Sequence, residues 1–280
     1  MGSGSEAKIY GKREPGKHDR LKWIEQTLDS GFVIGGDSNS FADDEVDEFL
    51  ILKTDEHGEI NVTDPDTWAV TFDEAGSPYS MDSFKFIRQT FDANSNLPGY
   101  IVGGTSQDYG GIWLLLKLNN GGDREWSWKY YNQPLVNFAS IQQAFDGGYV
   151  LGGESFVVKI DDLGDVKWSL KYGNNASDFL SSIQQQSEEG YVIIGKINYP
   201  DAGGFSVLKT NRQGGISCCP GIVESSDVRR GGDVNYAKVD RTAVIEQNII
   251  DYASLSLDVT SQIAVIDFSG SCTSNSVCPQ

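Results

Sequence analysis

The sequence predicts an all-β fold built from four degenerate copies of one strand-rich repeat. Three observations lead to this prediction: a glutamine-to-glycine motif that recurs four times, a lysine-turn-glycine motif that recurs four times, and a composition with 32 glycines and 11% aromatic residues. Many glycines together with many aromatic residues indicate short strands joined by tight turns. The 280 residues are enough for one large all-β domain with an appendage.

The first half of the repeat contains a conspicuous glutamine and ends in a short apolar strand. It reads WIEQTLDSGFVIGG from Trp23, FIRQTFDANSNLPGYIVGG from Phe86, SIQQAFDGGYVLGG from Ser140 and SIQQQSEEGYVIIG from Ser182. The glutamines are Gln26, Gln89, Gln143 and Gln185, and in three copies the glutamine stands ten residues before the closing glycine. We expect each to hydrogen-bond to a neighbouring repeat or to a turn. A ring of glutamines around a shared ligand is the alternative.

The second half of the repeat is an apolar strand that ends in lysine and runs into a tight turn. The copies read LKTDEHG, LKLNNGG, VKIDDLG and LKTNRQG, and they end at Gly58, Gly122, Gly164 and Gly214. The Asp or Asn side chain can bond its own backbone, and the glycine accepts positive φ, so a turn is expected. The lysines are expected at solvated strand ends; they are Lys53, Lys117, Lys159 and Lys209.

Four strands per repeat predict a β-propeller of about four blades. The second strands begin at Phe32, Tyr100, Tyr149 and Tyr191, which should occupy equivalent places, and the blades are expected at about 22–80, 81–135, 136–178 and 179–217. The tryptophans Trp68, Trp126, Trp128 and Trp168 fall on fourth strands. They are expected to cover the seams between blades, with sugar stacking as the alternative.

The fourth copy lacks its last strand, because ISCCPG follows where a tryptophan-containing strand is expected. The N-terminal AKIYG resembles the end of a WSLKYG strand. We therefore expect residues 8–11 to close the ring, with Lys8 to Tyr10 as the outer strand of the blade that contains Val192 and Leu208. The same strand could instead be donated to another subunit.

Residues 1–7 form a Gly/Ser-rich leader, 8–217 the propeller, and 218–280 a strand-rich C-terminal extension that packs on the propeller or forms a fifth blade. All four cysteines, Cys218, Cys219, Cys272 and Cys278, lie in this extension. No CxxC pair suggests zinc, so disulfides between the 218/219 pair and the 272/278 pair are expected. Such a bridge would add about 3 to 4 kcal/mol and implies an oxidising compartment.

The net charge of −18 disfavours nucleic acid as a partner. The acidic run DDEVDE makes Asp43, Asp44 and Asp47 candidate calcium ligands, although its spacing is not that of an EF-hand loop. No other cofactor is expected. No apolar run approaches the roughly 20 residues of a membrane span.

The elements IQQAFDGGYVLGG and VKIDDLGDVKWSLKYG resemble the IQQT-DGGYI-GG and LKxD-xxG-xxxW repeats of secreted or surface propeller proteins of archaea and bacteria. The resemblance covers residues 8 to about 225, and the segment GGISCCPGIVESSDV is similar to a cysteine-bearing tail of some archaeal members. It implies an extracellular or cell-surface protein and supplies no catalytic motif.

The chain has no GxSxG, HExxH or phosphate-loop motif and only two histidines. We therefore predict a non-enzymatic structural or partner-binding surface protein, which binds a protein, a glycan or copies of itself. The alternative is a carbohydrate-active enzyme or lectin-like glycan binder that uses an unrecognised carboxylate and aromatic cleft.

Overall fold

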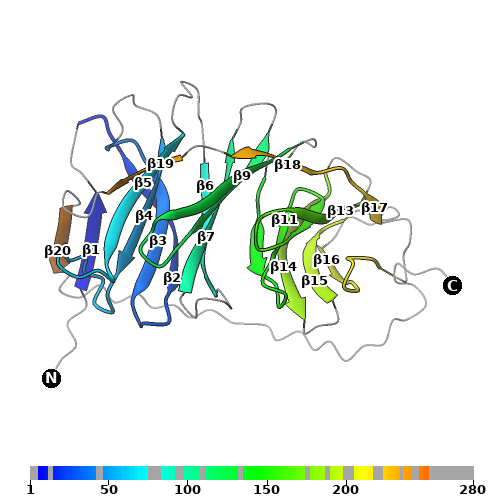
Figure 1. The fold of residues 1–280 in the computed structure, drawn as a ribbon, viewed down its shortest axis with the longest axis horizontal. Coiled ribbons are helices and arrows are strands. Elements are labelled where there is room, and N and C mark those ends of the chain that lie inside the picture. The colour runs from blue at the N-terminus through cyan, green and yellow to red at the C-terminus, as the bar shows by residue number, and fades with distance from the viewer. Residues whose placement is uncertain are drawn as a thin grey trace.

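The protein is all-β in its computed structural model (Figure 1), and the described residues contain no helix. The structure describes residues 6–11, 15–41, 47–74, 83–91, 98–106, 111–131, 135, 137–173, 177–186, 190–197, 205–216, 223–233, 236–240 and 246–251. Their strands form several antiparallel sheets, and none of these sheets closes into a barrel.

Sheets 1 and 2 are five-stranded. Sheet 1 holds β2 (Asp19–Gln26), β3 (Phe32–Ser38), β4 (Glu48–Thr54), β5 (Trp68–Glu74) and, at the edge, β19 (Tyr236–Asp240). Sheet 2 holds β6 (Ser83–Phe91), β7 (Pro98–Ser106), β8 (Ile112–Leu118), β9 (Arg124–Tyr131) and, at the edge, β18 (Arg229–Asp233).

The remaining sheets are sheet 3, sheet 4 and a two-stranded ribbon. Sheet 3 holds β10 (Ser140–Gln143), β11 (Tyr149–Gly153), β12 (Phe156–Ile160), β13 (Val166–Tyr172) and, at the edge, β17 (Val223–Ser225). Sheet 4 holds β14 (Phe179–Gln186), β15 (Gly190–Lys196) and β16 (Phe205–Lys209). The ribbon pairs β1 (Glu6–Gly11) with β20 (Glu246–Asp251).

The first strands of the four sheets pair with the second strands in one repeated register. Each repeat glutamine lies opposite the aromatic residue at or near the start of the second strand. The pairs are Gln26 with Phe32, Gln89 with Tyr100, Gln143 with Tyr149 and Gln185 with Tyr191. Because a slip of one residue would move every side chain to the other face, the shared register gives all four sheets the same distribution of side chains.

The C-terminal extension does not form a sheet of its own among the described residues. It runs backwards along the molecule and adds one edge strand to each fourth strand it meets: β17 to β13, β18 to β9, β19 to β5 and β20 to β1. We call these strands, β17 to β20, the return strands. They cover the outer edges of sheets 1, 2 and 3, which lowers the risk of edge-to-edge aggregation there.

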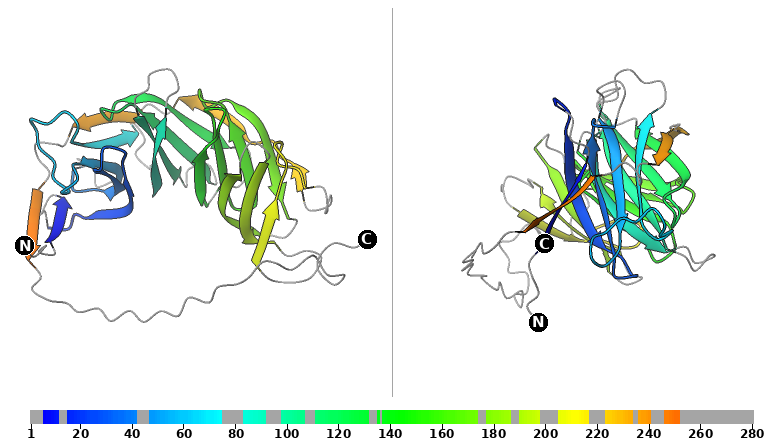
Figure 2. Two further views of the ribbon diagram at one scale, coloured as in Figure 1. Left: turned by 90° about the horizontal axis from the view of Figure 1, so that it is seen from below. Right: turned by 90° about the vertical axis from the view of Figure 1, so that its left-hand side faces the viewer.

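The sheets follow one another in a curved, open row, with β1 and β20 at one end and β16 at the other (Figure 2). Hydrophobic cores fill the space between neighbours. Val33 and Ile51 of sheet 1 pack with Tyr100 and Leu114 of sheet 2, and equivalent clusters join sheets 2 and 3 and sheets 3 and 4. Each sheet is therefore held mainly by burial against its neighbours.

The closing glycine of the repeat permits a close approach of two backbones. At Gly36 a Cβ atom would lie 2.0 Å from the Arg20 carbonyl oxygen, next to the irregularity in pairing between Leu21 and Trp23. Gly195 shows the same arrangement against the Phe179 carbonyl, at 2.2 Å. Glycine is required at these two positions because any side chain would clash with the neighbouring backbone.

We predict that Gly36→Ala lowers the free energy of unfolding by about 2 kcal/mol or more, because β2 and β3 must separate to admit the methyl group. Gly121→Ala is the matched control, since its nearest neighbour would lie 3.6 Å from the new Cβ. Urea unfolding measures both variants. Equal stability of the two would show that the close approach at Gly36 is wrong.

Candidate functional site

The repeat glutamines connect neighbouring sheets. Gln143 of sheet 3 reaches the end of β6 in sheet 2, where its amide accepts a hydrogen bond from Phe91 N at 2.8 Å and donates one to Phe91 O at 2.7 Å. Gln89 accepts from Leu28 N at 3.0 Å, and Gln185 accepts from Phe145 N at 2.9 Å. Gln26, in the first sheet, donates to Ser30 O of its own turn.

Tryptophans of the fourth strands pack edge-to-face on the aromatic residue of the next sheet. The ring centroids are 5.7 Å apart for Trp68 and Tyr100, 6.4 Å for Trp126 and Tyr149, and 5.8 Å for Trp168 and Tyr191. Burial raises the pKa of the Tyr191 phenol to about 12. These tryptophans therefore contribute to the seams between sheets.

The turn glycines all adopt positive φ: 74° at Gly58, 74° at Gly122, 87° at Gly164 and 78° at Gly214. The carbonyls of Gly58, Gly164 and Gly214 each accept a hydrogen bond from a tyrosine hydroxyl of the preceding strand layer. Tyr130 donates to Gly164 O at 2.8 Å, and Tyr172 donates to Gly214 O at 2.5 Å. The turn thus fixes both the hairpin and the contact between sheets.

Three of the repeat lysines are buried, so their predicted position at solvated strand ends is wrong. Lys53 is 2% exposed, and Lys117 and Lys159 are also buried, because the next sheet covers this face. The ammonium of Lys159 donates to Ile160 O at 2.8 Å and pairs with Asp146 at 2.9 Å. Each buried charge thus has a partner, as burial requires.

Lys53 is paired in the same way with Asp29, at 2.7 Å. Partial burial opposes ionisation of this carboxyl, but hydrogen bonds from Lys53 and Thr27 outweigh it and lower the pKa of Asp29. The lysine and the aspartate in the turn before the second strand therefore form one recurring unit, in sheets 1 and 3.

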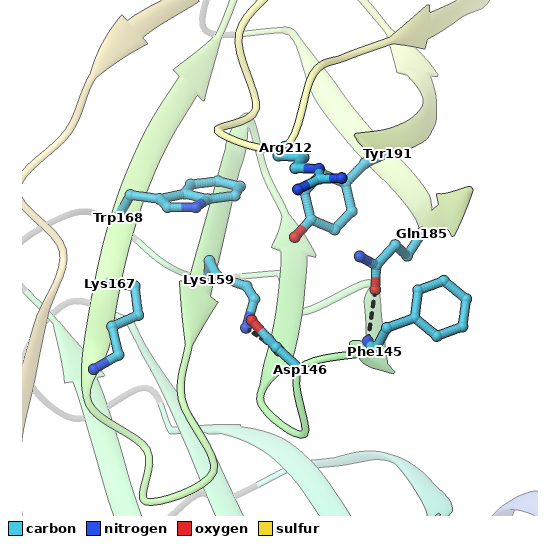
Figure 3. A pocket seen from close by; sticks show the side chains of 8 residues that line it. All are labelled: Phe145, Asp146, Lys159, Lys167, Trp168, Gln185, Tyr191 and Arg212. Atoms are coloured by element: carbon cyan, nitrogen blue, oxygen red, sulfur yellow. Dashed lines mark hydrogen bonds and ion pairs between the residues drawn. The ribbon is translucent and has the colours of Figure 1, made fainter. Parts of the chain in front are cut away.

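A pocket of about 350 Å³ lies at the seam between sheets 3 and 4 (Figure 3). Aromatic rings and cations line it: Phe145, Trp168 and Tyr191 with Lys159, Lys167 and Arg212, beside Asp146 and Gln185. At the seam between sheets 2 and 3, the positions of Lys167 and Arg212 are taken by Glu125 and Asp162. The pocket therefore has more basic side chains than the equivalent seam between sheets 2 and 3, although Lys159 is paired with Asp146.

A second pocket, of about 470 Å³, is lined by the first strands of all four sheets. Its walls carry serine and glutamine side chains, among them Gln142 and Gln184, together with the ion pair of Arg88 and Glu25 at 2.7 Å. Gln142 accepts a hydrogen bond from Gln185 N, so part of this polar surface is used within the protein.

The candidate calcium ligands are mostly outside the described residues: Asp43 and Asp44 lie there, whereas Asp47 pairs with His18 at 2.9 Å. The described residues contain no group of three or more histidine, cysteine or acidic side chains that could hold a metal. Cys218, Cys219, Cys272 and Cys278 also lie outside the described residues. Within the described part, no helix is long and apolar enough to cross a membrane.

The last sheet of the row exposes residues that its predecessors bury. Phe205 is 94% exposed and Val207 is 64% exposed. The residues at the same distances before the repeat lysine, Phe49 and Ile51 in sheet 1 and Trp113 and Leu115 in sheet 2, are at most 1% exposed. Sheet 4 thus ends the row with an uncovered face and, among the described residues, with a partner for β16 on one edge only, β15.

The first sheet, at the other end of the row, also exposes a residue whose equivalents are buried in the other sheets. Ile24 is 61% exposed, while the isoleucines at the same place before the other glutamines, Ile87, Ile141 and Ile183, are buried. A sheet that precedes the others in the row would cover this position. Among the described residues, the two ends of the arc thus expose positions that the other sheets bury, and we treat them as the candidate interaction surface.

The N-terminal strand was expected to pair with the sheet that contains Val192 and Leu208, and the structure corrects this. β1 pairs with β20, at the opposite end of the row from β16. Tyr10 donates to Gly58 O at 2.5 Å, the contact that Tyr172 makes with Gly214. This anchor holds β1 against sheet 1, so β1 cannot reach β16 of its own chain across the open arc.

We predict that Gln143→Ala lowers the free energy of unfolding by about 1 to 2 kcal/mol, because Phe91 N and O lose their partner. Gln26→Ala, which breaks a bond only within its own turn, should cost less. Chemical denaturation compares the two variants. The bridging role would be refuted if Gln26→Ala were the more damaging change.

The comparisons with known proteins give no family to which the chain can be assigned. No protein-family model matches it, and no curated protein matches it.

Proposed function

We propose that the chain is a non-enzymatic extracellular protein of the β-propeller type, which acts as a structural or partner-binding element at the cell surface. Its four sheets correspond to four propeller blades, the fourth of them incomplete. Disulfides among Cys218, Cys219, Cys272 and Cys278 would stabilise the C-terminal extension in an oxidising compartment.

The main observation behind the proposal is where the repeated polar residues make their contacts. The glutamines, turn glycines and buried lysines that recur in the sequence make contacts within a sheet or between sheets. Catalytic residues would instead converge on one cleft that contains a nucleophile or a pair of catalytic acids. The repeats therefore specify a scaffold, and its uncovered ends offer surfaces for assembly or for a partner.

The seam pocket of Figure 3 favours one second candidate, a glycan binder. Trp168 and Tyr191 supply aromatic surface, while Lys167 and Arg212 would suit an acidic sugar. Lys167 is already paired with Asp161 at 2.6 Å, which reduces the positive charge available. Binding to acidic oligosaccharides on a glycan array that is lost in Trp168→Ala would favour this candidate. No binding would favour the scaffold.

The extracellular scaffold predicts at least one disulfide between the 218/219 pair and the 272/278 pair. Peptide mass spectrometry without reduction, on protein secreted from an oxidising host, detects it. Reduction should then lower the melting temperature, because the bridge closes a long loop and contributes about 3 to 4 kcal/mol. Four free thiols in the secreted protein would contradict the assignment.

A further inference from the structure

The two uncovered ends of the arc are complementary halves of one sheet. Sheet 4 has first, second and third strands, whereas the ribbon has a fourth strand, β1, and a return strand, β20. That β1 is a fourth strand follows from Tyr10, whose bond to Gly58 O repeats those of Tyr130 and Tyr172 to the turn glycines of the following sheets. Among the described residues, β1 pairs on one edge only, with β20.

We propose that β1 of a second copy of this chain pairs with β16 and completes sheet 4, so that copies assemble head to tail. The inference rests on the proposed scaffold function and names its partner. Within one chain, β1 and β16 lie at opposite ends of the arc, each held by its neighbouring sheet (Figure 2). A second copy brings the two strands together without any change in the packing of the sheets.

The register of this contact follows from the complete sheets. Third and fourth strands pair Leu52 with Ala69, Leu116 with Ser127 and Val158 with Ser169, an apolar residue opposite a small one. The same offset places Leu208 opposite Ala7 of the second copy. It also places Phe205 opposite Tyr10, as Phe49 lies opposite Phe72 and Trp113 opposite Tyr130. Aromatic cross-strand pairs of this kind stabilise sheets.

The faces that would meet also match in size. In sheet 1 the second strand has Gly35, where an added Cβ would lie 2.2 Å from the Phe84 ring of sheet 2. Its equivalent in sheet 2 is Gly103, where an added Cβ would meet the Phe86 ring of the same sheet at 2.2 Å and the Phe138 ring, which precedes sheet 3, at 3.0 Å. Sheet 4 has Ile194 in place of this glycine, and sheet 1 has the smaller Leu21 in place of the phenylalanine. Ile194 is 43% exposed and Leu21 is 40% exposed. The larger residue on one end thus meets the smaller residue on the other.

The contact is heterologous, because one end of each copy meets the opposite end of the next. Such contacts give a closed ring or an open filament. Propellers contain about four to eight blades, so two copies with four sheets each reach the upper end of this range. A ring of two copies would bury both pairs of uncovered ends, including Ile24, Phe205 and Val207.

Cysteine cross-linking tests the inference. Folded Ala7→Cys and Leu208→Cys variants are mixed and oxidised, and peptide mass spectrometry locates the bond, which separates it from links through the native cysteines. We expect a two-chain product joined between positions 7 and 208. Leu208→Cys mixed with Asn248→Cys is the control and should give no such product, because Asn248 lies on β20, on the far side of β1.

The double variant Ala7→Cys, Leu208→Cys separates the two ways of completing the sheet. A bond within one chain would overturn the inference in favour of a ring closed by the chain's own terminus. The absence of any 7–208 bond in correctly folded protein would also overturn it. Neither result bears on the proposed scaffold function. That proposal would be contradicted by catalytic turnover or by four free thiols in the secreted protein.

The size of the unmodified protein gives an independent measurement. Light scattering should give twice the chain mass of 30.6 kDa for the ring, or larger species for a filament. Deletion of residues 1–11 should leave a soluble monomer that keeps the four sheets and loses only β1 and its pairing with β20. A full-length protein that stays monomeric at all concentrations would contradict the proposal.

Discussion

Each sheet of this protein can bury its hydrophobic faces only against another sheet, and this constraint determines the rest of the structure. The repeat lysine, the apolar residues before it and the aromatic residue of the second strand are buried where a neighbour is present. At the last sheet, where the neighbour is missing, Phe205 and Val207 are exposed. A repeat of this kind gains stability by stacking, so the ends of the row are its weak points.

The contact between neighbouring sheets also determines where the buried polar groups find their partners. A buried lysine is tolerated because the turn before the second strand brings an aspartate to it, as with Asp29 and Asp146. The glutamine bridges and the tyrosine bonds to the turn glycines then fix the orientation of one sheet relative to the next. The return strands pair with the outer edges of the sheets one after another, from sheet 3 back to sheet 1, which is the reverse of the order of these sheets along the chain.

Much of the fold could be predicted from the sequence, because the strands and turns of each repeat are determined by residues that are close together in the chain. The period-two strands, the turns at Gly58 and Gly164, and the correspondence of Tyr100, Tyr149 and Tyr191 depend on residues close in sequence. The burial of Lys53 could not be predicted, because it depends on a sheet contributed by later residues. The route of the return strands was missed for the same reason: β17 to β20 pair with strands that lie far away along the chain.

The candidate interaction surface was partly visible in the sequence, as the missing strand after Gly214 and the orphan strand at Tyr10. What the sequence could not give is the open arc, which separates these two strands within one chain. Hydrogen exchange along Phe205–Lys209 tests this account most directly. If β16 is paired on both edges in the assembled protein, all its amides should be protected as well as those of β12, and deletion of residues 1–11 should expose every second one. Fast exchange of alternate β16 amides in the full-length protein at every concentration would contradict the account.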